Sequence, residues 1–388
     1  RLLPALGIVL AASAAAAWAL LLPRDLHAFA KSLLAALAWS SNVHFWQAND
    51  YFAPAAERIP LLHTWSLAIE AQFYLLLPAL LLLVTRLARR WRAPTLCAVA
   101  LASLAHADAM SVAAPRAAFF LLQSRAWELL AGATLAAWLH DRPARARPMG
   151  LLMHTGAAAG LALIGFAVIS FNQGIPNPGP QFLIPVGGTL LVLACSAPQS
   201  GVGRMLAWRP LAGIGVASYS AYLWHQPVLA FLRQQDPARA LPSTLMIGVP
   251  LIAALTWVTW RLVEDPIRRG RLLGPRALAA CATGGLALLT AVGAACLWTA
   301  GVPERYEPRE RHMLSQADRG WREALSAYDL GRCFIDYRQS HATLVDLQCL
   351  KPRAGLPRVV VFGDSHAAHW LPGIRHEFVG SAFAVHQW

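Results

Sequence analysis

Apolar stretches of about 20 residues recur along the first 300 residues, and they constrain the fold more than any other feature of the sequence. A helix needs about that many apolar residues to cross the hydrocarbon core of a bilayer. Nine stretches meet this requirement, at 2–22, 66–85, 95–113, 117–138, 150–171, 181–197, 210–231, 243–263 and 276–300. Only 14% of the residues are charged, against about 25% in soluble globular proteins. The sequence therefore predicts an all-α polytopic membrane bundle of about nine spans and excludes a wholly soluble chain.

The net charge of +13 lies almost entirely in this apolar part. Residues 1–300 hold 22 basic and 10 acidic residues, a net charge of +12, whereas residues 301–388 hold 11 basic and 10 acidic residues, a net charge of +1. Residues 1–300 are therefore predicted to form the membrane domain, and the remainder an ordinary polar segment.

The basic residues of the membrane domain also predict its orientation. Fifteen of them precede the first span or follow the even-numbered spans: Arg1, Arg86, Arg89, Arg90, Arg92, Arg142, Arg145, Arg147, Arg204, Arg209, Arg261, Arg268, Arg269, Arg271 and Arg276. The opposite side has six: Arg24, Lys31, Arg58, Arg116, Arg233 and Arg239. Positive charge is retained in the cytoplasm, so the segment after residue 300 is predicted to face the periplasm or the cell exterior. The basic charge is then a topology signal, and no nucleic-acid partner is expected.

Two cysteines, Cys333 and Cys349, are the only ones in this exported segment. An oxidising compartment favours their pairing, and closing a loop of about 16 residues contributes about 3 kcal/mol in the chain-entropy model. We therefore predict a Cys333–Cys349 disulfide, with two free thiols as the alternative.

Ionisable and polar side chains recur in or beside the predicted spans, where they are costly and usually face the bundle interior or a wet cavity. Residues three, four or seven apart share one helical face. Three groups have such spacing: His63, Ser66 and Glu70 in HTWSLAIEAQFY; Arg125 and Glu128 in SRAWELLAG; and Ser218, Tyr222 and His225 in GVASYSAYLWHQPV. A fourth group, Glu264 and Asp265 in VEDPIRR, ends the eighth span.

Each group also has a structural interpretation. Arg125 and Glu128 would be an ion pair that fixes helix packing, the two histidines would be polar caps near the outer membrane surface, and VEDPIRR would be a cytoplasmic helix end. Together, however, these side chains could line one polar cavity. Histidine and carboxylate groups exchange protons with a reacting hydroxyl, and arginine holds a phosphate or stabilises an oxyanion. A proton-coupled transporter needs similar residues, so they leave enzyme and transporter open.

The exported segment ends in a pattern typical of an α/β domain. Residues 301–357 are predicted as a connector, and 358–388 as the start of a further domain with a buried strand at Arg358–Phe362, a tight turn and a helix from about Ala367. Ser365 lies at the strand-to-helix junction, where free backbone N–H groups and the helix dipole favour a developing oxyanion. Ser365 is therefore the candidate nucleophile.

These motifs resemble those of a known family. HTWSLAIEAQFY, SRAWELLAG, SYSAYLWHQPV and VEDPIRR, in this order on successive spans, resemble the acyltransferase-3 membrane family, and FGDSHA resembles the first block of an SGNH-hydrolase domain. The whole is similar to fused acyltransferase-3/SGNH proteins that O-acetylate bacterial surface glycans. The resemblance implies ten membrane helices, an eleventh crossing helix and a periplasmic SGNH domain with a flavodoxin-like α/β sandwich. Of the catalytic set it carries over only Ser365, with its backbone N–H as one oxyanion donor.

That family has more helices and further SGNH blocks, and Arg1 is not an initiator methionine. We therefore expect this sequence to be part of a longer protein.

The resemblance implies a membrane O-acyltransferase surrounded by inner-membrane lipid. Acetyl-CoA, or another acyl-CoA, would be the cytoplasmic donor substrate, with no bound cofactor and no metal. The acceptor would be a hydroxyl of a periplasmic or surface polysaccharide such as lipopolysaccharide O-antigen, peptidoglycan or an exopolysaccharide. The residues expected in the site are Ser365, His63, Glu70, Arg125, Glu128, Ser218, Tyr222 and His225. The alternatives are a membrane-anchored SGNH esterase, a transporter without chemistry and a non-catalytic remnant.

Overall fold

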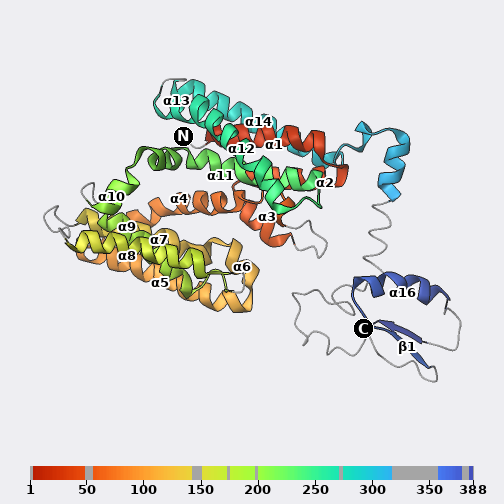
Figure 1. The fold of residues 1–388 in the computed structure, drawn as a ribbon, viewed down its shortest axis with the longest axis horizontal. Coiled ribbons are helices and arrows are strands. Elements are labelled where there is room, and N and C mark those ends of the chain that lie inside the picture. The colour runs from red at the N-terminus through yellow and green to blue at the C-terminus, as the bar shows by residue number, and fades with distance from the viewer. Residues whose placement is uncertain are drawn as a thin grey trace. The chain divides into compact units, whose positions relative to one another are not determined.

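The computed structural model describes residues 3–48, 56–141, 151–172, 175–196, 200–270, 274–316, 357–377 and 384–387 (Figure 1). The chain divides into two compact units, Arg1–Gly301 and Val302–Trp388. The first unit is a bundle of helices, and the second contains a short α/β element.

Helices of the first unit coincide with every predicted span. They are α1 (Leu3–Leu20), α4 (Thr64–Thr85), α5 (Arg89–Ala113), α7 (Leu122–Asp141), α8 (Leu151–Ser170), α9 (Leu183–Cys195), α11 (Arg209–Gln235), α12 (Leu241–Thr259) and α14 (Pro275–Trp298). Shorter segments join them: η1 (Ala56–Arg58), α6 (Pro115–Phe120), η3 (Pro180–Phe182), α10 (Gly201–Leu206), η4 (Trp260–Glu264) and α13 (Asp265–Arg268).

Six helical segments in the described part of the chain are long and apolar enough to cross a membrane: Leu3–Leu20, Thr64–Thr85, Arg90–Ala113, Met153–Ser170, Leu241–Arg268 and Pro275–Trp298. The apolar helix α9 is shorter, with 13 residues, and α7 carries the charged residues Arg125, Glu128 and Asp141. The protein is a multi-pass membrane protein, and the figure of nine spans stays a prediction.

Two helices lie outside the predicted spans, α2 (Pro23–Leu37) and α3 (Ser41–Gln47). Helix α2 buries Leu26, Phe29 and Leu33 on one face, and this i, i+3, i+7 spacing is typical of an amphipathic helix. The other face of α2 is polar, so the segment is not apolar enough to be predicted as a span. The spacing of its apolar residues was nevertheless a usable signal.

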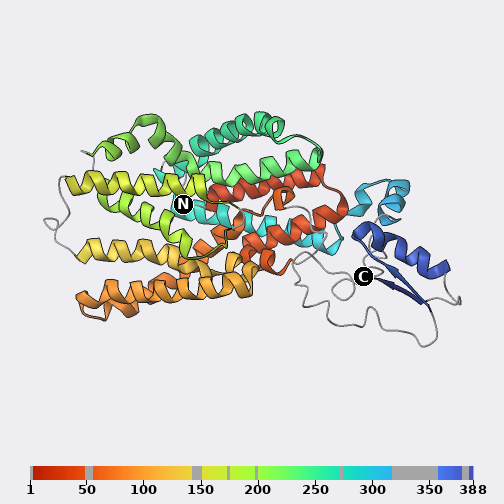
Figure 2. The same cartoon turned by 60° about the horizontal axis from the view of Figure 1, so that its bottom comes forward.

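Four helix pairs make the most extensive contacts: α5 with α7, α8 with α9, α11 with α12, and α2 with α14 (Figures 1 and 2). Leu104 and Ala107 of α5, for example, pack against Trp127 of α7. In Figure 1, α10 and α13 lie toward one end of the bundle, and α3 and α6 toward the other. Helices α10 and α13 follow the sixth and the eighth predicted span, and the orientation of these spans in a membrane stays a prediction.

Helices α8 and α9 cross closely at two glycines. A Cβ atom added at Gly188 would lie 2.7 Å from the carbonyl oxygen of Gly160, and one added at Gly160 would lie 2.6 Å from the carbonyl oxygen of Gly188. Small residues at such crossings let helix backbones approach closely in a membrane.

We expect Gly188→Ala to lower the free energy of unfolding by about 1–3 kcal/mol, the usual cost of overpacking. The effect should appear as a lower Tm of the purified protein in detergent. Gly187→Ala is the control, because nothing lies within 4 Å of a Cβ atom at Gly187. Equal Tm values for the two variants would contradict the close crossing.

The second unit contains a βαβ element. Its parts are β1 (Arg358–Val361), α16 (Ser365–Glu377) and β2 (Ala384–Gln387), and the two strands pair in parallel. Gly363 has a φ of +155°, and a Cβ atom there would lie 2.6 Å from the Cβ of Ala367, so this turn requires glycine. The predicted strand, turn and helix are confirmed, with the helix beginning at Ser365, two residues earlier than expected.

Candidate active site

His63 is the centre of a polar cluster between α4 and α11. It directly precedes α4, and its side chain is buried, with the residue only 6% exposed. The ring centroids of Tyr222 and His225, both on α11, lie 5.5 and 5.4 Å from that of His63, in edge-on arrangements. Neither ring nitrogen of His63 bonds to a side chain of a described residue, and the imidazole interacts with the backbone of Pro60. A buried imidazole that no side chain engages keeps a ring nitrogen available to a ligand.

Hydroxyl groups from both helices surround this histidine. The Tyr222 hydroxyl donates a hydrogen bond of 2.8 Å to the carbonyl oxygen of His63. The Ser66 hydroxyl lies within hydrogen-bonding distance of the Tyr222 hydroxyl and of the same His63 carbonyl, and its single hydrogen is donated to one of the two. Glu70, half-buried, lies one turn further along α4. The predicted group of His63, Ser66 and Glu70 thus contacts the predicted group of α11 through Tyr222 and His225.

Ser218 does not join this cluster. Its side chain is exposed, and its hydroxyl donates a 2.8 Å bond to the carbonyl oxygen of Gly215, in the preceding turn of α11. Ser218 therefore lies apart from the His63 cluster in the described structure, and its role in the site stays a prediction. The physical reason is that a serine in a helix can satisfy its hydroxyl on its own backbone.

Arg125 lies against the other side of the α4 motif. The residue is 8% exposed, its Nη1 donates a 2.9 Å ion-paired bond to Glu128, and its Nε donates a 3.1 Å bond to the carbonyl oxygen of Phe119. The guanidinium carbon lies 5.5 Å from the Trp65 ring centroid and 4.8 Å from that of Phe119, at cation–π distance. The guanidinium makes no further hydrogen bond to the described residues, so it retains N–H donors for an anionic or carbonyl ligand.

Sequence reasoning missed Trp65, which lies beside Ser66 and connects the two groups through α4. It also missed Gln72 in the same motif. The Gln72 amide donates to the Asn42 side chain at 2.8 Å and to the Trp39 carbonyl at 3.0 Å, which ties α3 to α4. An amide inside an apolar span was the available signal for Gln72, whereas Trp65 reads as an ordinary apolar residue.

The two acidic residues of the VEDPIRR motif make different contacts. Asp265 is 2% exposed and pairs with Arg268 at 3.2 Å and with Arg269 at 2.9 Å, as expected of a charged helix end. Glu264 instead accepts a 2.7 Å hydrogen bond from the Ser220 hydroxyl of α11. The interpretation of the whole motif as a helix end is therefore incomplete.

Ser365 is the first residue of α16 and follows the tight Gly363 turn after β1. This is the strand-to-helix junction where backbone N–H groups of a helix N-terminus are free. Cys333 and Cys349 lie outside the described residues, and their pairing stays a prediction.

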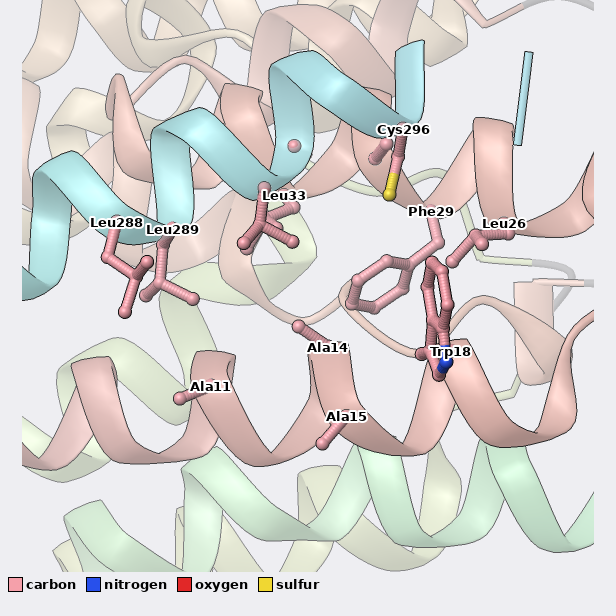
Figure 3. A pocket seen from close by; sticks show the side chains of 13 residues that line it. Ala11, Ala14, Ala15, Trp18, Leu26, Phe29, Leu33, Leu288, Leu289 and Cys296 are labelled. Carbon is pink, nitrogen blue, oxygen red and sulfur yellow. The ribbon is translucent and has the colours of Figure 1, made fainter. Parts of the chain in front are cut away.

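An apolar pocket of about 310 Å³ lies away from these polar groups, between α1, α2 and α14 (Figure 3). Residues that line it include Ala11, Ala14, Ala15, Trp18, Leu26, Phe29, Leu33, Leu288, Leu289 and Cys296. Its lining contains no acid, histidine or arginine, so it offers no group for acid–base chemistry.

Apolar membrane-crossing helices with a buried histidine, arginine and carboxylates among them define a class of membrane proteins that move or modify polar molecules within the bilayer. Residues 1–263 match the acyltransferase domain of the acyltransferase-3 family. The chain therefore belongs to this family of membrane acyltransferases, as its motifs indicated.

Three relatives show the range of the similarity. YrhL of Bacillus subtilis (strain 168), to which peptidoglycan O-acetyltransferase activity is ascribed, is 30% identical over 282 residues, which cover 69% of this chain and 44% of YrhL. BcsY of Komagataeibacter xylinus, to which a membrane-bound transacylase role is ascribed, is 32% identical over 307 residues, 78% of this chain and 74% of BcsY. The O-acetyltransferase OatA of Staphylococcus aureus (strain NCTC 8325 / PS 47) is 32% identical over 254 residues, 62% of this chain and 41% of OatA.

The chain thus spans less than half the length of YrhL and of OatA. No solved structure matches the chain.

Proposed function

We propose that this protein is a membrane O-acetyltransferase that moves an acetyl group from cytoplasmic acetyl-CoA to a hydroxyl of an extracytoplasmic polysaccharide. Family membership and the roles ascribed to YrhL, BcsY and OatA support this proposal. The single observation that carries it is the buried His63 beside Tyr222 and His225, whose ring nitrogens bond to no side chain among the described residues.

Acyl transfer at this site needs a group that accepts and returns one proton. The His63 imidazole accepts the proton of the attacking hydroxyl as its oxygen bonds to the acyl carbon. The C–S bond of the thioester then breaks, and the imidazolium returns the proton to the departing thiolate. The products are an ester and a free thiol, and the step needs no reactant besides the hydroxyl and the thioester.

Arg125 supplies the second requirement, a donor for the negative charge that develops on the acyl oxygen or is carried by the donor's phosphates. Trp65, Phe119 and Glu128 hold its guanidinium in one orientation. A planar, fixed guanidinium stabilises such charge better than a mobile lysine.

We further propose that the second unit begins an SGNH-like domain on the periplasmic side of the bacterial inner membrane. The β1–turn–α16 geometry, with Ser365 at the start of the helix, supports this assignment. Ser365 would receive the acetyl group as an acyl-enzyme and pass it to the glycan hydroxyl, which divides the transfer into two steps. The acceptor would be peptidoglycan, lipopolysaccharide O-antigen or an exopolysaccharide.

The Ser365→Ala variant distinguishes transfer from the alternative activity, removal of acyl groups by an esterase. In cells that carry the wild-type gene or Ser365→Ala, O-acetyl groups released from purified glycan by alkali are measured. We expect the variant to lose glycan acetylation to the level of the gene deletion. A rise in acetylation would instead identify an esterase.

A transporter without chemistry is tested by following the acetyl group itself. Purified protein in proteoliposomes is supplied with radiolabelled acetyl-CoA and, in separate reactions, with peptidoglycan or lipopolysaccharide. Label that becomes alkali-labile on either glycan supports the transferase, and uptake of label without transfer to any glycan tested would contradict it.

A further inference from the structure

Two side-chain hydrogen bonds attach α11 to the segment formed by α12 and η4. The Ser220 hydroxyl donates to Glu264 Oε2 at 2.7 Å, and Trp224 Nε1 donates to the Thr259 hydroxyl at 2.9 Å. Ser220, Trp224 and Thr259 are all buried. We call these four residues the α11 clamp.

The two acceptors of the clamp, Thr259 and Glu264, are five residues apart. A π-helical turn between them allows both side chains to face α11. In a regular α-helix, residues five apart point about 140° away from each other. The segment Trp260–Glu264 is π-helical, with backbone hydrogen bonds from i to i+5. This wider turn brings Thr259 and Glu264 much closer to one face than a regular α-helix would. Pro266, just beyond the turn, lacks the N–H that would continue the regular ladder. Single π turns inside α-helices are frequently found at functional sites.

The clamp holds the face of α11 that is opposite to the candidate active site. At about 100° per residue, Ser220 and Trp224 are about 40° apart around α11. Tyr222 and His225 are about 60° apart, and the centre of this pair lies about 150° from that of the first pair. A rotation of α11 that broke the clamp would therefore also turn Tyr222 and His225 relative to His63.

We propose that Ser220 and Glu264 are positioning residues for acyl transfer, which set the rotation of α11 and thereby direct Tyr222 and His225 toward the α4 motif. This inference rests on the proposed function. The contacts that carry it across to α4 are the Tyr222 bonds to Ser66 and to the His63 carbonyl, and the ring contact between His63 and His225.

The first test measures the helix orientation without reference to activity. Ser66→Cys and Tyr222→Cys are introduced together into the full chain after its native cysteines are replaced by alanine, and the pair is crosslinked with a short bismaleimide. We expect Glu264→Leu, which cannot accept a hydrogen bond, to lower the crosslinking yield at least threefold. Glu264→Gln should keep the yield, because its amide oxygen still accepts from Ser220. An unchanged yield in Glu264→Leu would overturn the proposal.

The second test uses acetyl transfer by the protein with its native Ser66 and Tyr222. We expect Glu264→Leu to lower kcat about tenfold with little change in the KM for acetyl-CoA, whereas Glu264→Gln should retain activity. The double variant, Ser220→Ala combined with Glu264→Leu, should lose no more activity than Glu264→Leu alone. Leu262→Ala, at a side chain that is 60% exposed in the same turn, is the control with unchanged kcat. Additive losses in the double variant would contradict the clamp. The two tests can also give different answers. If Glu264→Leu lowers the crosslinking yield but the wild-type protein transfers no acetyl group, the clamp is supported and the proposed acetyltransferase function is rejected.

Discussion

Replacing His63 by glutamine is expected to lower the rate of acetyl transfer from acetyl-CoA at least about 100-fold, because removal of a general acid–base group typically costs about 10²–10⁴ in rate. Glutamine occupies a similar volume and can form hydrogen bonds, but it cannot carry the proton. Initial rates in proteoliposomes with saturating acetyl-CoA measure the effect.

The stability of the same variant separates a functional from a structural role. In the wild type, the His63 ring bonds to no described side chain and interacts with the backbone of Pro60, so its replacement breaks no side-chain hydrogen bond. We therefore expect His63→Gln to unfold close to the wild-type Tm while losing activity. Loss of function without loss of stability is the pattern of a residue retained for its chemistry.

His106→Gln is the matched control for His63→Gln. His106 lies on α5, a helix of the same membrane unit, and its side chain is exposed. Its replacement should leave the rate within about twofold of wild type, because no proton transfer of the kind assigned to His63 depends on it. If His63→Gln were as active as His106→Gln, the assignment of the general base to His63 would be wrong.

The second large effect is expected at the ion pair of α7. Arg125→Ala and Glu128→Ala should each abolish acetyl transfer. Arg125→Ala removes the hydrogen-bond donor for the developing negative charge, and Glu128→Ala removes the carboxylate that holds the guanidinium in place. Glu128→Ala should also lower the amount of folded protein, because removal of one partner leaves an uncompensated buried charge. Acetyl transfer per amount of membrane-inserted protein measures the functional part.

A double replacement tests whether the pair has only a structural role. Arg125→Met combined with Glu128→Leu removes both charges and keeps the volume, a change that is often neutral or stabilising for buried ion pairs. We expect this variant to fold at wild-type abundance and to remain inactive. Activity in the double variant would show that the pair contributes packing alone.

The sequence motifs predicted much of the candidate site. His63 with Ser66, Tyr222 with His225, and Arg125 with Glu128 could be grouped because each pair recurs at helical spacing within one motif. Ser218 fits the same spacing but does not join the His63 cluster, because periodicity places a residue on a face without saying which acceptor its hydroxyl reaches. Its actual acceptor is the carbonyl of Gly215.

Other residues of the site could not be identified from local pattern. Trp65 is indistinguishable in sequence from a lipid-facing aromatic residue until Arg125, 60 positions later, lies against its ring. Ser220 reads as a small residue within a span, and its partner Glu264 is 44 residues away. Such contacts depend on which helices are neighbours.

The sequence by itself determined that this is a multi-pass membrane protein of the acyltransferase-3 family, because apolar length and charge content respond directly to the bilayer and the motifs are contiguous in the chain. It also determined the strand, turn and helix around Ser365, which depend on local backbone geometry. Only the tertiary structure decided that α4 lies between the two groups, with His63 facing Tyr222 on one side and Trp65 facing Arg125 on the other. Only the tertiary structure showed the π turn that brings Thr259 and Glu264 closer to one face. These features depend on the rotation of each helix against its neighbours, which spacing within a single helix does not specify.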